Sequence, residues 1–311
     1  MQNVPGELGE PGGSMMHRSM SRRTALRSAV GTALAAGGLT LGGTVPAAAA
    51  ARAAGAPATA AGGVFRDVRD FHGSWEGAYD GRRAHLTIAV AQEPPAMLAT
   101  VYFTFTDLDR DETYTGSRRN VPPGTRAIAA ITLGGPALLS WPTLLIHTRD
   151  TDILSGTADP GGRRHPMVFY RSTAAPSRVH NRPFRGFDDW CGLPVGQGRY
   201  LGSLDGRGAR LDVDCSYAGS ERRMTFRLGD LERRIEWYAR LTESEVRRWS
   251  HDRQRNPLAG VWMKPYWERR EPLWIDSLYW HGHNAAYVTG ESTRQGGPCG
   301  MSFIRRTPLP G

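Results

Sequence analysis

The sequence predicts an all-β protein of two tandem antiparallel meander β-barrels, with one short helix inserted in the second. Three observations predict this fold: an internal repeat across most of the chain, segments that alternate with period two, and Asp-Gly pairs between such segments. The length of 311 residues suits two domains of ordinary size. The hydrophobic fraction of 40% lies in the range of globular chains.

The repeat has two long parts, and neither needs a gap. Residues 75–88 match 200–213 at an offset of 125, and residues 154–171 match 288–305 at an offset of 134. His147 falls opposite His281 at the second offset. Several collinear matches indicate a tandem duplication. We therefore expect a first barrel unit at 65–174, a linker at 175–190 and a second barrel unit at 191–308.

A third match competes with this division. Gly260 to Ile275 also aligns with Gly73 to Ile88, which taken alone would start a new domain near residue 258. Only about fifty residues would then remain, which is marginal for an independent core. We interpret this match as a similarity between hairpins inside the barrels.

The first 53 residues are predicted to be an export signal and leader, followed by a flexible linker at 54–64. A segment with three arginines, Ser21 to Arg27, precedes 24 uncharged residues, rich in Ala and Gly, that end in a run of alanines. A basic start, an apolar middle and a small-residue end are typical of export signals. The segment resembles a twin-arginine signal, with Leu26 in the expected place and Ala25 where an aromatic residue is usual. We expect a secreted protein, with a membrane anchor as the minor alternative because the apolar run is nearly long enough.

The positive charge gives little reason to expect a nucleic-acid partner. The chain has 39 basic and 30 acidic residues, a formal charge of +9. Removing residues 1–53 takes away five Arg and two Glu, which leaves 34 basic and 28 acidic residues, or +6. We expect no nucleic-acid partner for an exported protein, and no stable membrane span after the signal.

Local patterns predict the strands, the turns and the helix. Residues 86–91 and 101–106 alternate apolar with polar or small side chains, as half-buried strands do. Asp80-Gly81 and Asp205-Gly206 predict hairpin turns because they tolerate positive φ. The helix is expected to start at Thr242, whose capping box is completed three residues later, and to run to about Arg253.

Each predicted unit begins with Gly-x-Trp or Gly-x-Tyr and ends in an Arg after an apolar strand. This arrangement resembles the calycin superfamily of lipocalins, fatty-acid-binding proteins and avidins, in which a first-strand Trp packs under a basic residue of the closing strand. The resemblance implies two calycin-like barrels, closed by Trp75 with Arg171 and by Tyr200 with Arg305. A guanidinium over an aromatic face gains cation–π attraction.

Aromatic residues crowd the second unit, since seven of the nine tryptophans follow residue 189. Such a set can line a barrel mouth or stack on sugar rings, or can simply fill a core. The candidate ligand-binding residues are Trp262, Tyr266, Trp267, Trp274, Tyr279, Trp280, His281 and His283.

His281 and His283 are the most suggestive pair. On a strand, residues i and i+2 face the same side, together with Ile275, Ser277 and Tyr279, so both imidazoles could reach one metal ion. No third ligand is indicated, so no metal site is predicted. Asp276 is close to His281 in sequence but on the opposite face, which disfavours an Asp–His general base.

Three cysteines lie in the second unit, at positions 191, 215 and 299. One disulfide is plausible after export, and Cys191 with Cys215 closes the shorter loop.

Three functions stay open from the sequence. The first is a secreted protein that binds a small apolar or aromatic molecule, or a glycan, in or at the mouth of a barrel. The second is a secreted isomerase, cyclase or lyase that uses the barrel interior. The third is an extracellular protein-interaction or protease-inhibitor module. Catalytic residues, the cofactor and the oligomeric state stay unknown.

Overall fold

The computed structural model describes residues 63–92, 97–171, 182–186, 188–191, 195–267, 270–294 and 297–306. These residues belong to one compact unit of the chain. The expected signal at 1–53, most of the expected linker at 54–64 and half of the expected linker at 175–190 lie outside them. Within the described ranges, no helix is long and apolar enough to cross a membrane.

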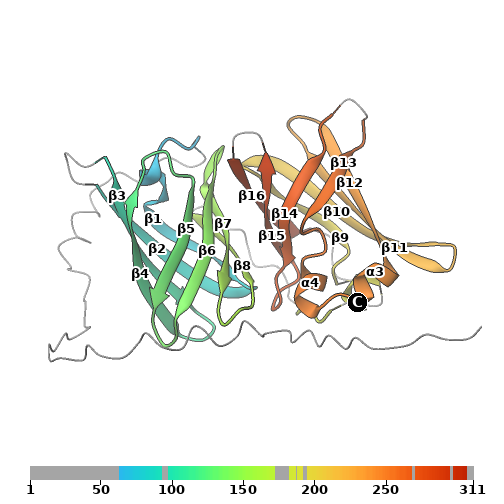
Figure 1. The fold of residues 1–311 in the computed structure, drawn as a ribbon, viewed down its shortest axis with the longest axis horizontal. Coiled ribbons are helices and arrows are strands. Elements are labelled where there is room, and N and C mark those ends of the chain that lie inside the picture. The colour runs from blue at the N-terminus through green and yellow to red at the C-terminus, as the bar shows by residue number, and fades with distance from the viewer. Residues whose placement is uncertain are drawn as a thin grey trace, which may run out of the picture. The chain divides into compact units, whose positions relative to one another are not determined.

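The first barrel is a closed antiparallel meander of eight strands, drawn from blue to green in Figure 1. A 3-10 helix, η1 (Val68–Phe71), precedes it. The strands are β1 (Gly73–Tyr79), β2 (Arg82–Ala91), β3 (Ala99–Asp107), β4 (Glu112–Val121), β5 (Ala127–Gly134), β6 (Leu139–His147), β7 (Asp150–Asp159) and β8 (His165–Arg171).

The second barrel repeats this topology, and β16 pairs with β9 to close it. Its strands are β9 (Gly198–Leu204), β10 (Arg207–Ala218), β11 (Glu221–Asp230), β12 (Ile235–Thr242), β13 (Val261–Pro265), β14 (Leu273–Trp280), β15 (Tyr287–Arg294) and β16 (Gly297–Arg305). The short helices are α2 (Asp188–Cys191), α3 (Glu243–Arg247) and α4 (His251–Arg255). The prediction of an all-β fold of two tandem barrels is confirmed, and β13 belongs to the second barrel rather than to a new domain.

The two predicted Asp-Gly turns join the first two strands of each barrel. Asp80 and Gly81 have φ of 48° and 87°, and Asp205 and Gly206 have φ of 53° and 84°. Two successive positive φ values define the tight turn whose twist matches that of the flanking strands. Asp and Gly at these places therefore fix the register of both opening hairpins.

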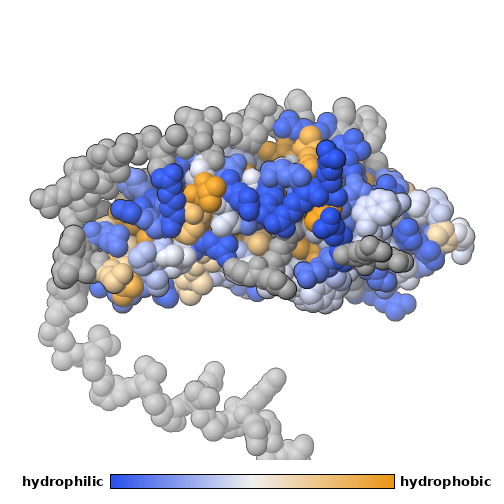
Figure 2. Space-filling view, turned by 90° about the horizontal axis from the view of Figure 1, so that it is seen from above, coloured by the Kyte–Doolittle hydropathy of each residue, from blue (hydrophilic) through white to orange (hydrophobic). Residues whose placement is uncertain are grey.

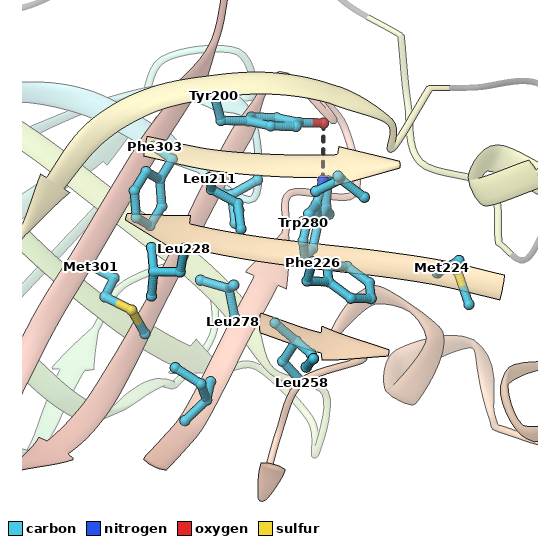
Figure 3. Packing of buried hydrophobic residues seen from close by; sticks show 14 of the residues in the cluster. Tyr200, Leu211, Met224, Phe226, Leu228, Leu258, Leu278, Trp280, Met301 and Phe303 are labelled. Atoms are coloured by element: carbon cyan, nitrogen blue, oxygen red, sulfur yellow. Dashed lines mark hydrogen bonds between the residues drawn. The ribbon is translucent and has the colours of Figure 1, made fainter. Parts of the chain in front are cut away.

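Buried side chains occupy the interior of both barrels. Trp75, Trp141, Phe103, Phe105 and Phe169 are fully buried in the first barrel. In the second, Figure 3 shows the packing of Tyr200, Leu211, Met224, Phe226, Leu228, Leu258, Leu278, Trp280, Met301 and Phe303. On the face seen in Figure 2, hydrophilic residues predominate and hydrophobic ones form small separate groups. The period-two pattern thus sorts apolar side chains inward and polar ones outward.

At one end of each barrel, the aromatic residue of the first strand lies beside the arginine of the last strand. Trp75 lies opposite Arg171 in the β1–β8 register, and the guanidinium carbon is 4.3 Å from the ring centroid. Tyr200 lies opposite Arg305 in the β9–β16 register. The indole nitrogen of Trp75 donates to the carbonyl of Phe71 at 3.1 Å, and the hydroxyl of Tyr200 donates to the carbonyl of Gly196 at 3.1 Å. A ring in the core thus ties the preceding segment across the barrel end.

The helical insertion differs from the prediction in length. Thr242 caps α3 through the expected capping box with Glu245, but α3 ends at Arg247. The side chain of Ser250 then accepts from the backbone N–H of Arg253 and starts α4. The expectation of one helix to about Arg253 is therefore wrong, because a second cap restarts the helix.

Part of the expected linker packs into the second barrel. Phe184 and Trp190 are buried and belong to its core cluster. The indole of Trp190 lies edge-on to that of Trp280, with centroids 4.7 Å apart. The folded second unit therefore includes residues that precede 191.

Candidate functional site

The candidate aromatic residues of the second barrel do not form one group. Trp280 is fully buried in the core, and its indole N–H donates to the hydroxyl of Tyr200 at 3.1 Å, as Figure 3 shows. Tyr279 is buried outside that core cluster and is hydrogen-bonded to Asn256. Trp262, Tyr266 and Trp267 are 59%, 64% and 64% exposed. The interior residues stabilise the barrel, whereas the exposed ones are available to a ligand.

A β-bulge in β14 separates these residues. The register with β15 shifts between Ile275 and Ser277. Leu273 and Ile275 belong to the core before the bulge, and Leu278 and Trp280 belong to it afterwards. The expectation that Ile275 shares a face with Ser277 is therefore wrong, because a bulge adds one residue and reverses the alternation.

We define the aromatic face as Trp262, Tyr266, Trp267, Trp274 and Asp276. Trp262 and Trp274 are register partners on β13 and β14, and their ring centroids are 5.0 Å apart at an interplanar angle of 54°. The neighbours Met263, Leu273 and Ile275 point into the core. Since side chains alternate along a strand, the two indoles point outward together.

The carboxylate of Asp276 is fixed beside these indoles. It accepts from the indole N–H of Trp274 at 2.8 Å and from the hydroxyl of Thr293 on β15 at 2.7 Å. Each oxygen carries one of these bonds and keeps further acceptor capacity. The face therefore combines exposed rings with a positioned, exposed hydrogen-bond acceptor.

The rim of the aromatic face is formed after β13 ends. The rings of Tyr266 and Trp267 lie edge to face, with centroids 5.4 Å apart. The backbone N–H of Tyr266 donates to the carbonyl of Glu236 at 2.8 Å, which holds this bend against β12. Two further exposed rings are thus held by backbone as well as by each other.

A second carboxyl group lies near Asp276. Alternation along β15 places Glu291 on the same outward side as Thr293, because Val288 points into the core. Burial and, to a smaller extent, the negative charge of Asp276 raise the pKa of Glu291 to about 7, although the charge of Arg164 opposes the shift. A carboxyl group near the aromatic face can therefore be protonated near neutral pH.

The two candidate histidines do not share a strand face. β14 ends at Trp280, so His281 and His283 both lie in the following loop. His281 is fully buried, with Nε2 2.8 Å from the hydroxyl oxygen of Thr289, whereas His283 is exposed. The expectation of two imidazoles on one strand face is wrong because the strand stops one residue before them.

The described residues contain no group of three or more His, Cys, Asp or Glu that could hold a metal ion. Cys215 is disulfide-bonded, and the thiol of Cys299 contacts the carbonyl of Gly297 at 3.7 Å. The side chain of Cys191 lies outside the described residues, so its pairing with Cys215 stays a prediction.

A buried polar cluster lies where the two barrels meet, which we call the junction. Its centre is Asp80, which accepts from Nδ1 of His165 at 2.8 Å, from the backbone N–H of Gly282 at 2.7 Å and from the guanidinium of Arg255. Burial alone would raise the pKa of Asp80, but the bond from His165 and the charge of Arg255 lower it to about 2. An ionised Asp80 thus binds the second barrel to the first.

The junction was missed by sequence reasoning. Asp80 was expected only to shape a turn, and neither His165 nor Arg255 was a candidate. The Asp-Gly pair occurs at equivalent positions of both repeats, which was a signal that both turns have a role. The partners of Asp80, His165 and Arg255, lie 85 and 175 residues away from it in sequence, so local patterns do not indicate them. The aromatic face shares no residue with this cluster.

No family model matches this chain, and no characterised protein matches it in sequence. The geometry of the two sites is therefore the basis for assigning a function.

Proposed function

We propose that this protein is an exported carbohydrate-binding protein and that the aromatic face is its binding site. One observation carries the proposal: the exposed ring of Trp262 packs against Trp274, whose indole N–H is bonded to the exposed carboxylate of Asp276, and two more exposed rings follow within four to five residues of Trp262. The signal-like segment at 21–51 supports export. The closed barrel is compatible with a binding role and supplies a rigid wall for the site.

The chemistry of the face fits a sugar. A pyranose ring has one face of C–H groups and an edge of hydroxyls, so it stacks on an aromatic ring and donates to an acceptor beside it. Trp262 and Trp274 supply the rings, and Asp276 supplies the acceptor. Because Asp276 is already held by two donors, it needs little ordering when a sugar arrives.

The outer face supports binding better than the interior does. Fully buried aromatic side chains fill the interior of both barrels, among them Trp141 in the first and Trp280 in the second. A small apolar ligand, or an enzyme reaction in the interior, would have to displace packed side chains, which costs several kcal/mol for each aromatic residue removed from a core. The exposed rings need no such rearrangement.

The test is binding to polysaccharides built from glucose, N-acetylglucosamine, xylose or mannose. We expect at least one of them to retard the protein in affinity electrophoresis and to change its tryptophan fluorescence. Trp262→Ala and Trp274→Ala should each weaken that binding by about threefold to tenfold, since an aromatic stacking contact contributes about 0.5–1.5 kcal/mol.

Tyr217→Ala is the matched control, because Tyr217 is 69% exposed on β10 and is not part of the aromatic face. It should bind as the parent protein does. The proposal fails if no polysaccharide binds, or if both Trp variants bind like the parent. Binding of an apolar fluorophore alone, or of a protein partner through Trp262, would also overturn it in favour of those ligand classes.

A further inference from the structure

The contacts of the junction occur twice, once at Asp80 of the first barrel and once at Asp205 of the second. From here on, the junction means the whole contact between the two barrels. The backbone N–H of Gly282 donates to the carboxylate of Asp80 at 2.7 Å, and the backbone N–H of Thr148 donates to that of Asp205 at 2.9 Å. Asp205 follows Asp80 by 125 residues, and Gly282 follows Thr148 by 134. These are the offsets of the internal repeat, so the two contacts are equivalent.

The main chain repeats the same relation. The N–H of His283 donates to the carbonyl of Asp80 at 2.9 Å, and the N–H of Arg149 donates to the carbonyl of Asp205 at 3.3 Å. His283 and Arg149 are again related by an offset of 134. Each barrel therefore inserts its Asp-Gly turn against the loop that follows the sixth strand of the other.

The fit at the turns is equally close on both sides. A Cβ atom on Gly81 would overlap the backbone nitrogen of Asn284, and one on Gly206 would overlap that of Asp150. Asn284 and Asp150 are equivalent positions. Neither turn has room for a side chain at its second residue.

The apolar part of the junction follows the same symmetry. A separate cluster contains Ile153, Tyr170 and Ile304, with Tyr287 packed against it. Ile153 is equivalent to Tyr287, and Tyr170 is equivalent to Ile304, at the offset of 134. Each barrel thus contributes the same two positions to one shared cluster, as in an isologous dimer interface.

We infer that the junction is a self-complementary protein–protein interface, and that the partner each barrel fits is a second copy of the same barrel unit. In this chain the second copy is the other half, and the interface holds both halves together without the peptide connection between them. This inference is independent of carbohydrate binding.

The experiment cuts the folded full-length protein between the barrels. A protease recognition sequence with flexible flanks is inserted between Ala174 and Ala175, and cleavage is confirmed on a denaturing gel. We expect the cut protein to elute from size-exclusion chromatography at the mass of the uncut chain at micromolar concentration. Elution as two half-size species would overturn the inference.

Variants at the turns make the test specific to the interface. Gly81→Ala and Gly206→Ala should each raise the dissociation constant of the cut halves at least tenfold, and by similar factors. Gly219→Ala is the control, because Gly219 also has positive φ, of 67°, but a Cβ there meets nothing within 4 Å. If all three variants weaken the cut complex equally, the turns are not interface elements. Circular dichroism of the uncut variants reports whether the barrels still fold.

Discussion

The two ends of the junction, at Asp80 and at Asp205, make the same main-chain contacts but differ in their side-chain contacts. Asp205 binds the loop of the first barrel through the N–H and the hydroxyl of Thr148. Asp80 makes the equivalent backbone contact and adds His165 and Arg255. Arg255 lies on the helical insertion, between β12 and β13, that only the second barrel has between these strands. The two ends thus share their main-chain contacts, while only the Asp80 end has the buried ion cluster with His165 and Arg255.

The two buried histidines show a second difference. Both nitrogens of His147 are bonded, to the hydroxyl oxygens of Ser203 at 2.9 Å and Ser155 at 3.1 Å. His281 keeps the bond equivalent to Ser155, with Thr289, but its Nδ1 has no partner in the described part of the chain. The position equivalent to Ser203 in the first barrel is Ala78. One missing hydroxyl therefore explains the unpaired nitrogen.

The largest expected difference in the free energy of unfolding is between substitutions of Asp80 and Asp205. Asp80→Asn leaves the guanidinium of Arg255, whose side chain is 8% exposed, without its carboxylate, and should lower the free energy of unfolding by about 3–5 kcal/mol. Asp205→Asn should cost about 1 kcal/mol, since it weakens hydrogen bonds to neutral donors. Urea denaturation at pH 7 measures both. Equal losses would contradict the comparison.

Low pH should destabilise the protein because the two buried histidines of the junction, His147 and His281, become protonated when it unfolds. Burial lowers the pKa of His281 to about 3 and that of His147 to about 4, from about 6.5. Below pH 6.5 the unfolded chain binds protons that the folded chain does not, so stability falls as the pH falls. Each histidine should remove about 2 kcal/mol between pH 6.5 and pH 5.

His281→Gln tests this assignment. The variant should lose about 2 kcal/mol less than the parent protein between pH 6.5 and pH 5, because one titrating group is gone. Denaturant titrations at the two pH values measure the difference. The same pH dependence in parent and variant would show that His281 is protonated in the folded state.

Adding a hydroxyl at position 78 should stabilise the protein, and removing the one at position 203 should destabilise it. Ala78→Ser places a hydroxyl where Nδ1 of His281 lacks a partner, and should raise the free energy of unfolding by about 1 kcal/mol. Ser203→Ala should lower it by at least about 1 kcal/mol, because the N–H of Gly206 also loses its acceptor. Ala84→Ser, in the apolar core of the first barrel, is the control and should destabilise. Destabilisation by Ala78→Ser equal to that of the control would refute the explanation.

The smallest expected effect is at the aromatic face. Trp262→Ala should change the free energy of unfolding by no more than about 0.5 kcal/mol, because the side chain is 59% exposed. Trp280→Ala should cost about 3–5 kcal/mol, because its ring is fully buried. Thermal unfolding of both variants shows whether Trp262, unlike Trp280, contributes little to stability. A large loss in Trp262→Ala would assign it to the fold.

Sequence patterns succeeded where the interactions are local or repeated. The Asp80-Gly81 turn, the capping box at Thr242 and the period-two strands follow from conformational preferences of neighbouring residues. The sequence proposed the aromatic residues of 262–280 as one set, but the bulge after Ile275 divides them between the interior and the outer face. A bulge leaves no clear composition signal, so alternation alone assigned the wrong face to part of β14.

The sequence by itself determined a duplicated all-β chain, the turns that open both barrels and the aromatic residues that pair with arginine at their closing strands. Only the tertiary structure decided that Asp80 meets Arg255, that His281 lacks the hydroxyl given to His147, and that Trp262 is exposed while Trp280 is buried. The physical reason is range. Turn, cap and alternation energies act between near neighbours in the chain, whereas pairing across the junction and burial depend on how whole barrels close and pack.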